Sequence, residues 1–408
     1  MSIRSTPSTA VRLSAHRPGL SKHRLAGLVA GLVLAFAAPA AVAQLQTLPP
    51  EVITAQGSLA PDQRTLVEKF VADAAKGLSG DAKAIREARV TLVTPLTQPQ
   101  VGVLFRTTYS EQLAKILPDL VNAGGTKGIN ALIIAGETAT ARMFDLAEEQ
   151  LAARETAMRF AAVSSLGAGF EQARTRTPGV PVERIRTAVT KLATRLGTET
   201  DSFVVDAITR SILSAARNSQ TGYESLREFA LDALVKGMAD RLASATTITN
   251  DDAAMLQALL RAGLAARDEL AVDERNRGVA GGISRLSSAA VKDLATLGGE
   301  MLALSARLIK DPDLNPAADA EDVIRERAKK SRALIGQIAG TAQAIITLAG
   351  SALQSTFTNP AGANLATVAT EGKNESDARF LTTVADLVGP GGLLSKQPFE
   401  ITRTFKLP

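Results

Sequence analysis

The sequence has 408 residues, with 46 Lys and Arg against 41 Asp and Glu, which gives a formal net charge of +5. It contains no Cys and no Trp, and aromatic residues make up 3% of the chain. The absence of Cys excludes disulfide bonds and a cysteine nucleophile. Because sheets favour β-branched and aromatic residues, a core of Ala, Leu, Val and Ile favours packed helices instead.

The first 43 residues have the three parts of a bacterial secretory signal. An acid-free basic region is followed by the apolar run Leu25–Ala38, and the small residues Ala41, Val42 and Ala43 precede Gln44. We therefore predict cleavage between Ala43 and Gln44, and export to the periplasm or the extracellular space. The alternative is a retained membrane helix, which needs about 20 mainly apolar residues, more than this run supplies. The basic residues are Arg4, Arg12, Arg17, Lys22 and Arg24.

Removal of the signal changes the composition of the remaining chain. Five of the 46 basic residues and both histidines, His16 and His23, lie in residues 1–43, so 41 basic residues then balance 41 acidic ones. A neutral chain lacks the clustered basic excess that nucleic-acid binding needs. Without His and Cys it also lacks the residues of a Ser-His-Asp triad and of most zinc, copper and haem sites. We therefore expect no nucleic-acid partner and no cofactor.

Helical periodicity dominates the chain from Pro61 onward, after residues 44–60, which we predict to be an extended linker. Leu66, Phe70 and Ala74, for example, share one helical face. Asp81, Asp201 and either Asn250 or Asp251 are candidate N-caps. The predicted helices of this region are Thr65–Gly77, 81–95, Ser110–Val121, Lys127–Ala135, Thr138–Gln150, Arg154–Gln172, 181–197, 201–217, 223–244 and 251–270.

Helix pairs begin near residues 138, 181 and 223, a spacing of about 42 residues that lies in the range of HEAT and armadillo repeats. Two segments, Asn130–Glu137 and Ala157–Gly169, also look like HEAT helices. The second resembles the R-x-A-A-x-x-L-G pattern through Arg159, Ala161, Ala162, Leu166 and Gly167. The resemblance implies that residues 61–272 form a superhelical scaffold whose concave face binds protein. The alternative is an irregular all-α bundle.

The last third of the sequence differs from the region before it. Ser284–Lys310 and Asp322–Gln354 predict two longer helices that form an antiparallel hairpin over residues 273–356. Residues 357–408 predict a polar tail with one short helix at Ser376–Val388. The final segment, Phe399–Pro408, reads either as a short strand or as an extended tail that packs on the helices.

The segment between the two long helices resembles the EF-hand calcium loop. Pro316 occupies the position where that loop needs Gly, and an Asp replaces the bidentate Glu at the end, so a solvated interhelical loop is the alternative. The candidate ligands, at loop positions one, three, five, nine and twelve, are Asp311, Asp313, Asn315, Asp319 and Asp322.

No charged residue occurs from Ala333 to Thr370. Within this run, Leu334–Leu353 has about the length of a membrane span, and its Gly336-x-x-x-Gly340 motif favours close helix packing. Two glutamines within the run and three basic residues before it, which would lie on the exported side, oppose insertion. A buried central helix explains the run better than a membrane span.

Candidate catalytic patterns are few. The glycine clusters, including Gly389–Gly392, lack the G-K-[ST] of a phosphate loop and predict turns, and the G-x-S-x-G and S-x-x-K patterns of serine hydrolases do not occur. The pairs Glu148-Glu149 and Asp251-Asp252 could serve a carboxylate-based hydrolase, but adjacent residues on a helix point in different directions. We therefore assign no catalytic residue.

The sequence favours an exported, non-enzymatic, all-α scaffold or structural protein that binds a protein partner. Exposed Phe and Arg side chains in residues 154–186 are the first candidates for that contact, because Arg and large aromatic residues dominate binding energy at interfaces. A carboxylate-based envelope hydrolase and a membrane-associated helical protein remain the alternatives.

Overall fold

The computed structural model describes residues 47–98, 100–175, 180–218, 221–244, 248–278, 285–317, 319–354, 356–358 and 362–408. Residues Leu45–Pro408 group together as one unit, separate from Met1–Gln44. The predicted signal and its cleavage site at Ala43 and Gln44 therefore lie outside the described residues.

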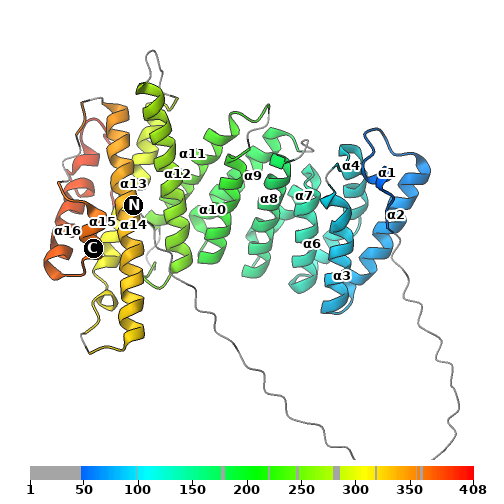
Figure 1. Ribbon diagram of the computed structural model, residues 1–408, viewed down its shortest axis with the longest axis horizontal. Helices are drawn as coiled ribbons and strands as arrows, with labels where there is room; N and C mark the ends of the chain where they lie inside the picture. Colours follow the sequence, from blue (N-terminus) through cyan, green and yellow to red (C-terminus); the bar gives the residue numbers. More distant parts are fainter. Residues whose placement is uncertain are drawn as a thin grey trace, which may run out of the picture. The chain divides into compact units, whose positions relative to one another are not determined.

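The described residues form α-helices joined by loops and short 3₁₀ turns, and no strand occurs among them (Figure 1). The predicted all-α fold class is confirmed. The helices are α1 (Pro50–Ile53), α2 (Pro61–Ala75), α3 (Ala82–Val93), α4 (Val103–Leu113), α5 (Leu117–Asn122), α6 (Gly125–Thr138), α7 (Ala141–Glu149), α8 (Thr156–Thr175), α9 (Val182–Thr198), α10 (Ser202–Ala216), α11 (Leu226–Ser244), α12 (Ala253–Gly278), α13 (Ser288–Ile309), α14 (Asp322–Leu353), α15 (Leu365–Thr370) and α16 (Asn374–Val388).

Side-chain caps begin several of these helices. Asp81 and Asp201 accept hydrogen bonds from backbone N–H groups in the first turns of α3 and α10, as the sequence predicts. At α12 the prediction is wrong by one residue, because the carboxylate that accepts from Met255 N, at 3.2 Å, belongs to Asp252. Asp251 instead pairs with Arg327 of α14.

The helices of residues Leu45–Pro408 alternate between two layers. In one layer α6, α8, α10, α12 and α14 each pack against the next, and in the other layer α7, α9, α11 and α13 do the same. Consecutive helices therefore pair across the layers, and each pair packs on its neighbours in sequence order (Figure 1). The predicted pair starts near residues 138, 181 and 223 correspond to α7, α9 and α11.

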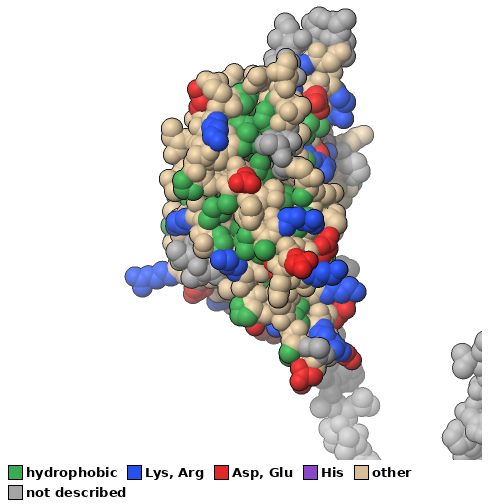
Figure 2. Space-filling model, turned by 90° about the vertical axis from the view of Figure 1, so that its left-hand side faces the viewer, with side chains coloured by type: hydrophobic (Ala, Val, Ile, Leu, Met, Phe, Trp, Pro, Cys, Tyr) green, Lys and Arg blue, Asp and Glu red, His purple; other side chains and the backbone are tan. Residues whose placement is uncertain are grey.

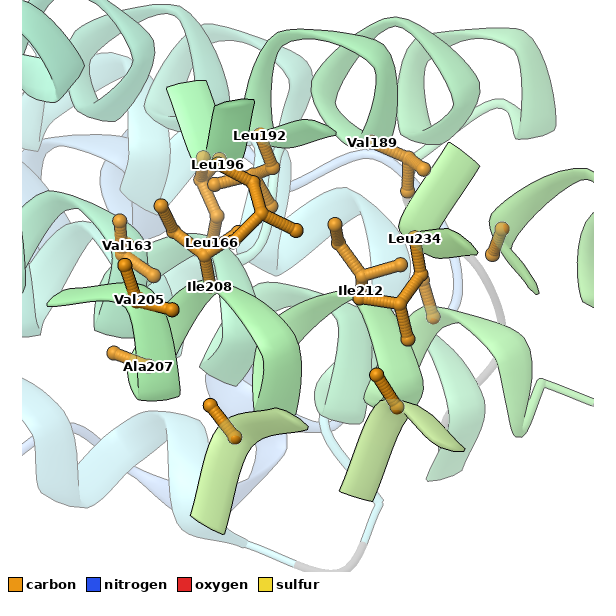
Figure 3. Close-up of a cluster of buried hydrophobic side chains, with 14 of the residues drawn as sticks. Val163, Leu166, Val189, Leu192, Leu196, Val205, Ala207, Ile208, Ile212 and Leu234 are labelled. Atoms are coloured by element: carbon orange, nitrogen blue, oxygen red, sulfur yellow. The ribbon is translucent and has the colours of Figure 1, made fainter. Parts of the chain in front are cut away.

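Aliphatic side chains from both layers fill the space between them, with few aromatic residues. Burial of each such side chain contributes about 1.5–3 kcal/mol. Figure 3 shows one section of this core, in which side chains of α8, α9, α10 and α11 meet. The labelled residues, all buried, are Val163, Leu166, Val189, Leu192, Leu196, Val205, Ala207, Ile208, Ile212 and Leu234.

Polar contacts also connect neighbouring pairs within each layer. In the layer of α6 and α8, Gln172 Nε2 donates to Glu137 Oε2 at 2.9 Å. In the other layer, Lys191 Nζ of α9 donates to Glu148 Oε2 of α7 at 2.5 Å. The partners differ in type from pair to pair, so the sequence shows no regular pattern of paired residues at the repeat spacing.

The predicted linker at 44–60 is wrong for the residues that are described. Residues 50–53 form α1, and Leu48, Val52 and Leu59 are buried against the first helices. These few apolar residues have no helical period, so the sequence did not predict that the segment packs. Their burial nevertheless holds the segment against the helices that follow it.

The predicted domain boundaries also need correction. The boundary at residues 272 and 273 falls inside α12, and the predicted hairpin of α13 and α14 is present but packs on α11 and α12 as the next pair of the array. Residues 357–408 are not a polar tail with one helix, because α15 packs on α14 and α16 packs on α13, which adds a further pair. Phe380 and Val384 of α16 are fully buried.

The last residues, 396–408, form what we call the C-terminal strap. They have no strand, but Phe399, Ile401 and Phe405 are buried, so of the two sequence alternatives the packed tail is correct. The ring of Phe405 lies over Gly299 of α13, where a Cβ atom would come within 2.5 Å of it. Figure 2 shows the α16 end of the molecule, where hydrophobic side chains gather near the middle and charged ones lie mainly toward the edges.

Candidate functional site

A groove of about 420 Å³ lies between α11 and the first turns of α13, and we call it the α11–α13 groove. Residues at helical spacing on α11 face it, because positions three or four apart lie on one side of a helix. Its larger apolar lining residues are buried or half-buried and form the floor, whereas its charged residues, apart from the buried Glu269, are half-buried or exposed and form the rim. The apolar residues are Phe229, Leu231, Val235, Leu286 and Leu294, and the charged ones are Arg186, Glu228, Asp232, Lys236, Glu269 and Asp293.

Lys236 sits between two carboxylates at the groove. Its Nζ lies 3.0 Å from Asp232 and 3.4 Å from Asp293. The hydrogen bond to Asp232 and the charges of both carboxylates raise the pKa of Lys236 against the opposing effect of burial. One ammonium group therefore joins α11 to α13, and this part of the groove keeps an excess of one negative charge.

Arg186 lies at another side of the groove and stacks on an aromatic ring. Its Cζ lies 5.2 Å from the ring centre of Phe229, a cation–π distance. It also donates a hydrogen bond to Ser225 Oγ. The guanidinium comes from α9, so the groove spans side chains of consecutive helix pairs.

Glu269 of α12 supplies a carboxylate that is 6% exposed. Its Oε2 accepts from Arg227 Nε and Nη2 at 3.0 Å and 2.7 Å, whereas none of the described residues donates to its Oε1. Glu228 on the rim is exposed and likewise has no partner among the described residues. The groove thus has carboxylate oxygens, on Glu269 and Glu228, that none of the cations at the groove contacts.

The sequence did not identify this groove. Its charged residues come from α9, α11, α12 and α13 and have no local motif. One signal existed: Arg227 and Glu269 are separated by 42 residues, close to the repeat spacing, and they pair across neighbouring helices. A search for opposite charges one repeat apart would have found this pair.

The structure does not bring the predicted calcium ligands together. Asp311 accepts a hydrogen bond from its neighbour Asp313 N, Asn315 contacts Arg332 and Asp377, and Asp322 pairs with Arg325. No group of three or more acidic side chains suited to a metal occurs among the residues that the structure describes. Residues Pro312–Leu314 form a 3₁₀ turn here, with Pro312 at its first position, and Pro316 stands where the calcium loop requires Gly.

The predicted acid pairs do not form a catalytic pair. Glu148 is buried against Arg184 and Lys191, while its neighbour Glu149 is exposed. Asp251 and Asp252 divide between an ion pair and a helix cap. A glycosidase-type mechanism needs two carboxyl groups that face one substrate, and neither pair has that arrangement.

One carboxyl group does have a raised pKa. Burial raises the pKa of Glu300 in α13, and the charge of Arg403 and its hydrogen bond, with Nε 2.7 Å from Glu300 Oε1, oppose that rise. Glu300 is enclosed by the C-terminal strap and does not line the α11–α13 groove. Its environment is that of a buried structural pair.

The Arg and Phe side chains of residues 154–186 are mostly engaged inside the molecule. Arg159 is buried against Glu199, and Arg184 stacks on Phe144. Phe160 is 38% exposed, as expected, but Phe203, which lies outside the predicted range, is the more exposed at 68%. It lies in the first turn of α10, two residues after the cap Asp201.

Among the described residues, α14 is the one helix long and apolar enough to cross a membrane. It packs against α12, α13 and α15, and just over half of its most apolar stretch is buried. The Gly336-x-x-x-Gly340 motif faces α15, where Ala366 lies against both glycine positions. The motif therefore serves helix packing within this chain.

Comparison with known proteins gives no family. No family model matches the sequence, and no curated protein matches it. A solved structure described as a crystal structure of an engineered protein is 15% identical, covering 84% of this chain and 89% of that chain, with a TM-score of 0.25. Similarity at that level carries no inference about function.

Proposed function

We propose that this chain is a non-enzymatic helical scaffold of the HEAT-like kind that binds a protein partner through the α11–α13 groove. The observation that carries the proposal is the groove itself, because its apolar floor and charged rim match the usual anatomy of a protein interface. Rigid helices on both sides hold its residues in place, as a preformed site requires.

The arrangement of the carboxylates supports this function over a hydrolase. Asp232 and Asp293, the groove acids that lie near each other, share the ammonium of Lys236. A hydrolase needs one free acid and one free base at the substrate. The packing of α14 against three helices likewise supports a scaffold over a membrane-associated protein.

Site-specific photo-crosslinking in the native cells tests the binding role. A photoreactive residue replaces Ala289, which is exposed in the groove, and, as a matched control, Ala378, which is exposed on α16. We expect a protein adduct of discrete mass from position 289 and none from position 378. Equal labelling at both positions, or no adduct at 289, would contradict the proposal.

We also propose that the chain is exported and begins at Gln44. The basic region, the apolar run and the Ala41-Val42-Ala43 site support export. Intact-mass measurement of the protein from its native cells tests this, with a mass that corresponds to residues 44–408 expected. A chain that begins at Met1 would overturn it.

A further inference from the structure

We infer that the α11–α13 groove binds a Lys or Arg side chain carried by an extended segment of the partner protein, with Glu269 Oε1 as the acceptor. This inference rests on the proposed function and names the chemistry of the bound segment. Glu269 is a buried carboxylate of the groove, and only one of its two oxygens accepts hydrogen bonds from the described residues.

Glu269 is 6% exposed, and its two oxygens differ. Oε2 accepts both hydrogen bonds from Arg227, and Oε1 accepts none from the residues that the structure describes. An ionised carboxylate can accept about four hydrogen bonds. Glu269 lines the groove, and its Oε1 is accessible and accepts no hydrogen bond from the described residues, so it favours a donor with positive charge, since such hydrogen bonds are the strong ones.

The balance of charge in the groove points to the same guest. Its lining contains four carboxylates but only two cations, Arg186 and Lys236. Both cations are engaged, Lys236 by Asp232 and Asp293, and Arg186 by Ser225 and the Phe229 ring. The unmatched acceptors are Glu269 Oε1 and Glu228, so a cation complements the groove and an anion does not.

The floor identifies the cation as part of a polypeptide. Phe229, Leu231 and Leu294 line the groove beside the carboxylates. The aliphatic stem of Lys or Arg buries well on such a surface while its head reaches a carboxylate, and an apolar residue next to it in an extended segment covers the rest of the floor. A bare metal ion would leave this apolar surface exposed.

Selection of peptides on the full chain tests the inference. A phage-displayed library of random linear dodecapeptides is panned against the protein, and the enriched peptides are synthesised. We expect a shared Lys or Arg beside an apolar residue. Replacement of that Lys by norleucine, or of Arg by citrulline, should weaken binding about tenfold, the typical effect of one charge-assisted hydrogen bond.

Variants of the chain separate the acceptor from general effects of folding. Glu269→Gln should weaken the enriched peptide about tenfold, and its effect should not add to that of the norleucine or citrulline peptide. Arg227→Gln, which removes the competing internal cation, should tighten binding severalfold. A folding defect would weaken both variants alike. Glu274→Gln, an exposed acid on the same helix, is the matched control and should leave the affinity unchanged.

Several results would overturn the inference while leaving the proposed function intact. One such result is the enrichment of acidic or purely apolar peptides, or of no peptide at all. Another is a Glu269→Gln variant that binds the selected peptide as tightly as the unchanged protein does. A third is an Arg227→Gln variant that binds it more weakly than the unchanged protein. Binding of spermidine without binding of any peptide would replace the polypeptide guest by a small polyamine. Failure of the proposed function is distinct, because it appears as the absence of a protein adduct at position 289.

Discussion

Glu199 connects three consecutive segments of the chain through one buried carboxylate. Arg159 of α8 donates to both of its oxygens, at 2.8 Å and 2.9 Å, and Arg195 of α9 donates to Oε2. The amides of Thr200 and Asp201 at the start of α10 donate to Oε1. The carboxylate thus fixes the turn between α9 and α10 and ties it to the preceding pair.

Replacement of Glu199 by Gln should lower the free energy of unfolding by about 3–5 kcal/mol, because it leaves the buried Arg159 without its counter-charge. Urea denaturation of the purified chain measures the change. Glu149→Gln, at an exposed carboxylate that has no partner among the described residues, should stay within about 0.5 kcal/mol of the unchanged protein. If both variants lose a similar free energy of unfolding, the buried ion pair of Glu199 and Arg159 stabilises the protein no more than an exposed carboxylate does.

The same carboxylate makes stability depend on pH. Burial opposes its ionisation, but hydrogen bonds from Arg159, Asp201 and Arg195 outweigh burial and lower the pKa of Glu199 to about 2. In the unfolded chain a Glu has a pKa of about 4.3. A depressed pKa stabilises the folded state above the unfolded value, so this contribution is lost as the pH falls from about 4.3 toward 2.

Unfolding free energies measured at several pH values from 7 to 3 test this dependence. We expect a steeper fall below pH 4.3 in the unchanged protein than in Glu199→Gln, which cannot titrate at this position. Curves that differ by a constant offset over the whole range would rule out a contribution from the ionisation of Glu199.

At the scale of elements, α14 shows how a sequence motif can be recognised without its partner. The Gly336-x-x-x-Gly340 spacing predicted close packing, and the packing exists, but the partner is α15, a helix of six residues. A segment that short has too few residues to show a helical period. The charge-free run contains α14, whose most apolar stretch is 56% buried in the packing against α12, α13 and α15.

Gly336→Ala tests the close approach of these two helices. A Cβ atom there would lie 2.5 Å from Thr370 Cγ2 and 2.9 Å from the backbone oxygen of Ala366. We expect the free energy of unfolding to fall by about 1–2 kcal/mol, since overpacking outweighs the gain in helix propensity. Gly197→Ala is the control, because its Cβ would be 3.7 Å from the nearest atom, and it should be neutral or stabilising by up to about 1 kcal/mol. Equal effects on thermal unfolding would contradict this reading of the motif.

At the scale of the whole molecule, the helices and their pairing could be predicted because apolar periodicity is local and strong. The groove could not, because Glu269, Lys236 and Asp293 meet only after three helices have packed. For the last residues, a tail packed on the helices was one of two alternatives that the sequence left open, and the contact of Phe405 with Gly299 of α13 could not be identified. Such sites depend on residues far apart in sequence, and no single window of the sequence contains them.

Deletion of residues 397–408 should destabilise the C-terminal pairs by more than about 3 kcal/mol. It removes two buried phenylalanines and leaves Glu300 buried without Arg403. We expect a lower melting temperature, and self-association on a sizing column because an apolar face of α13 becomes exposed. Arg403→Gln keeps the apolar packing and should lower the melting temperature without association. A truncated chain that melts like the full chain would contradict a structural role of the strap.

The strap also sets an order of completion during synthesis. Most polar contacts between neighbouring helix pairs join residues that are about one pair apart in the sequence, as with Gln172 and Glu137 or Lys191 and Glu148. Each pair can therefore fold onto the preceding one as soon as it leaves the ribosome. Arg403, in contrast, binds Asp240 and the backbone oxygen of Ala239, 163 and 164 residues earlier. The end of α11 and the middle of α13 therefore stay uncovered until residues 399–405 have been synthesised. If synthesis stops before the strap, the first helix pairs of the released chain can fold. Its last pairs then expose the apolar surface that the strap would cover.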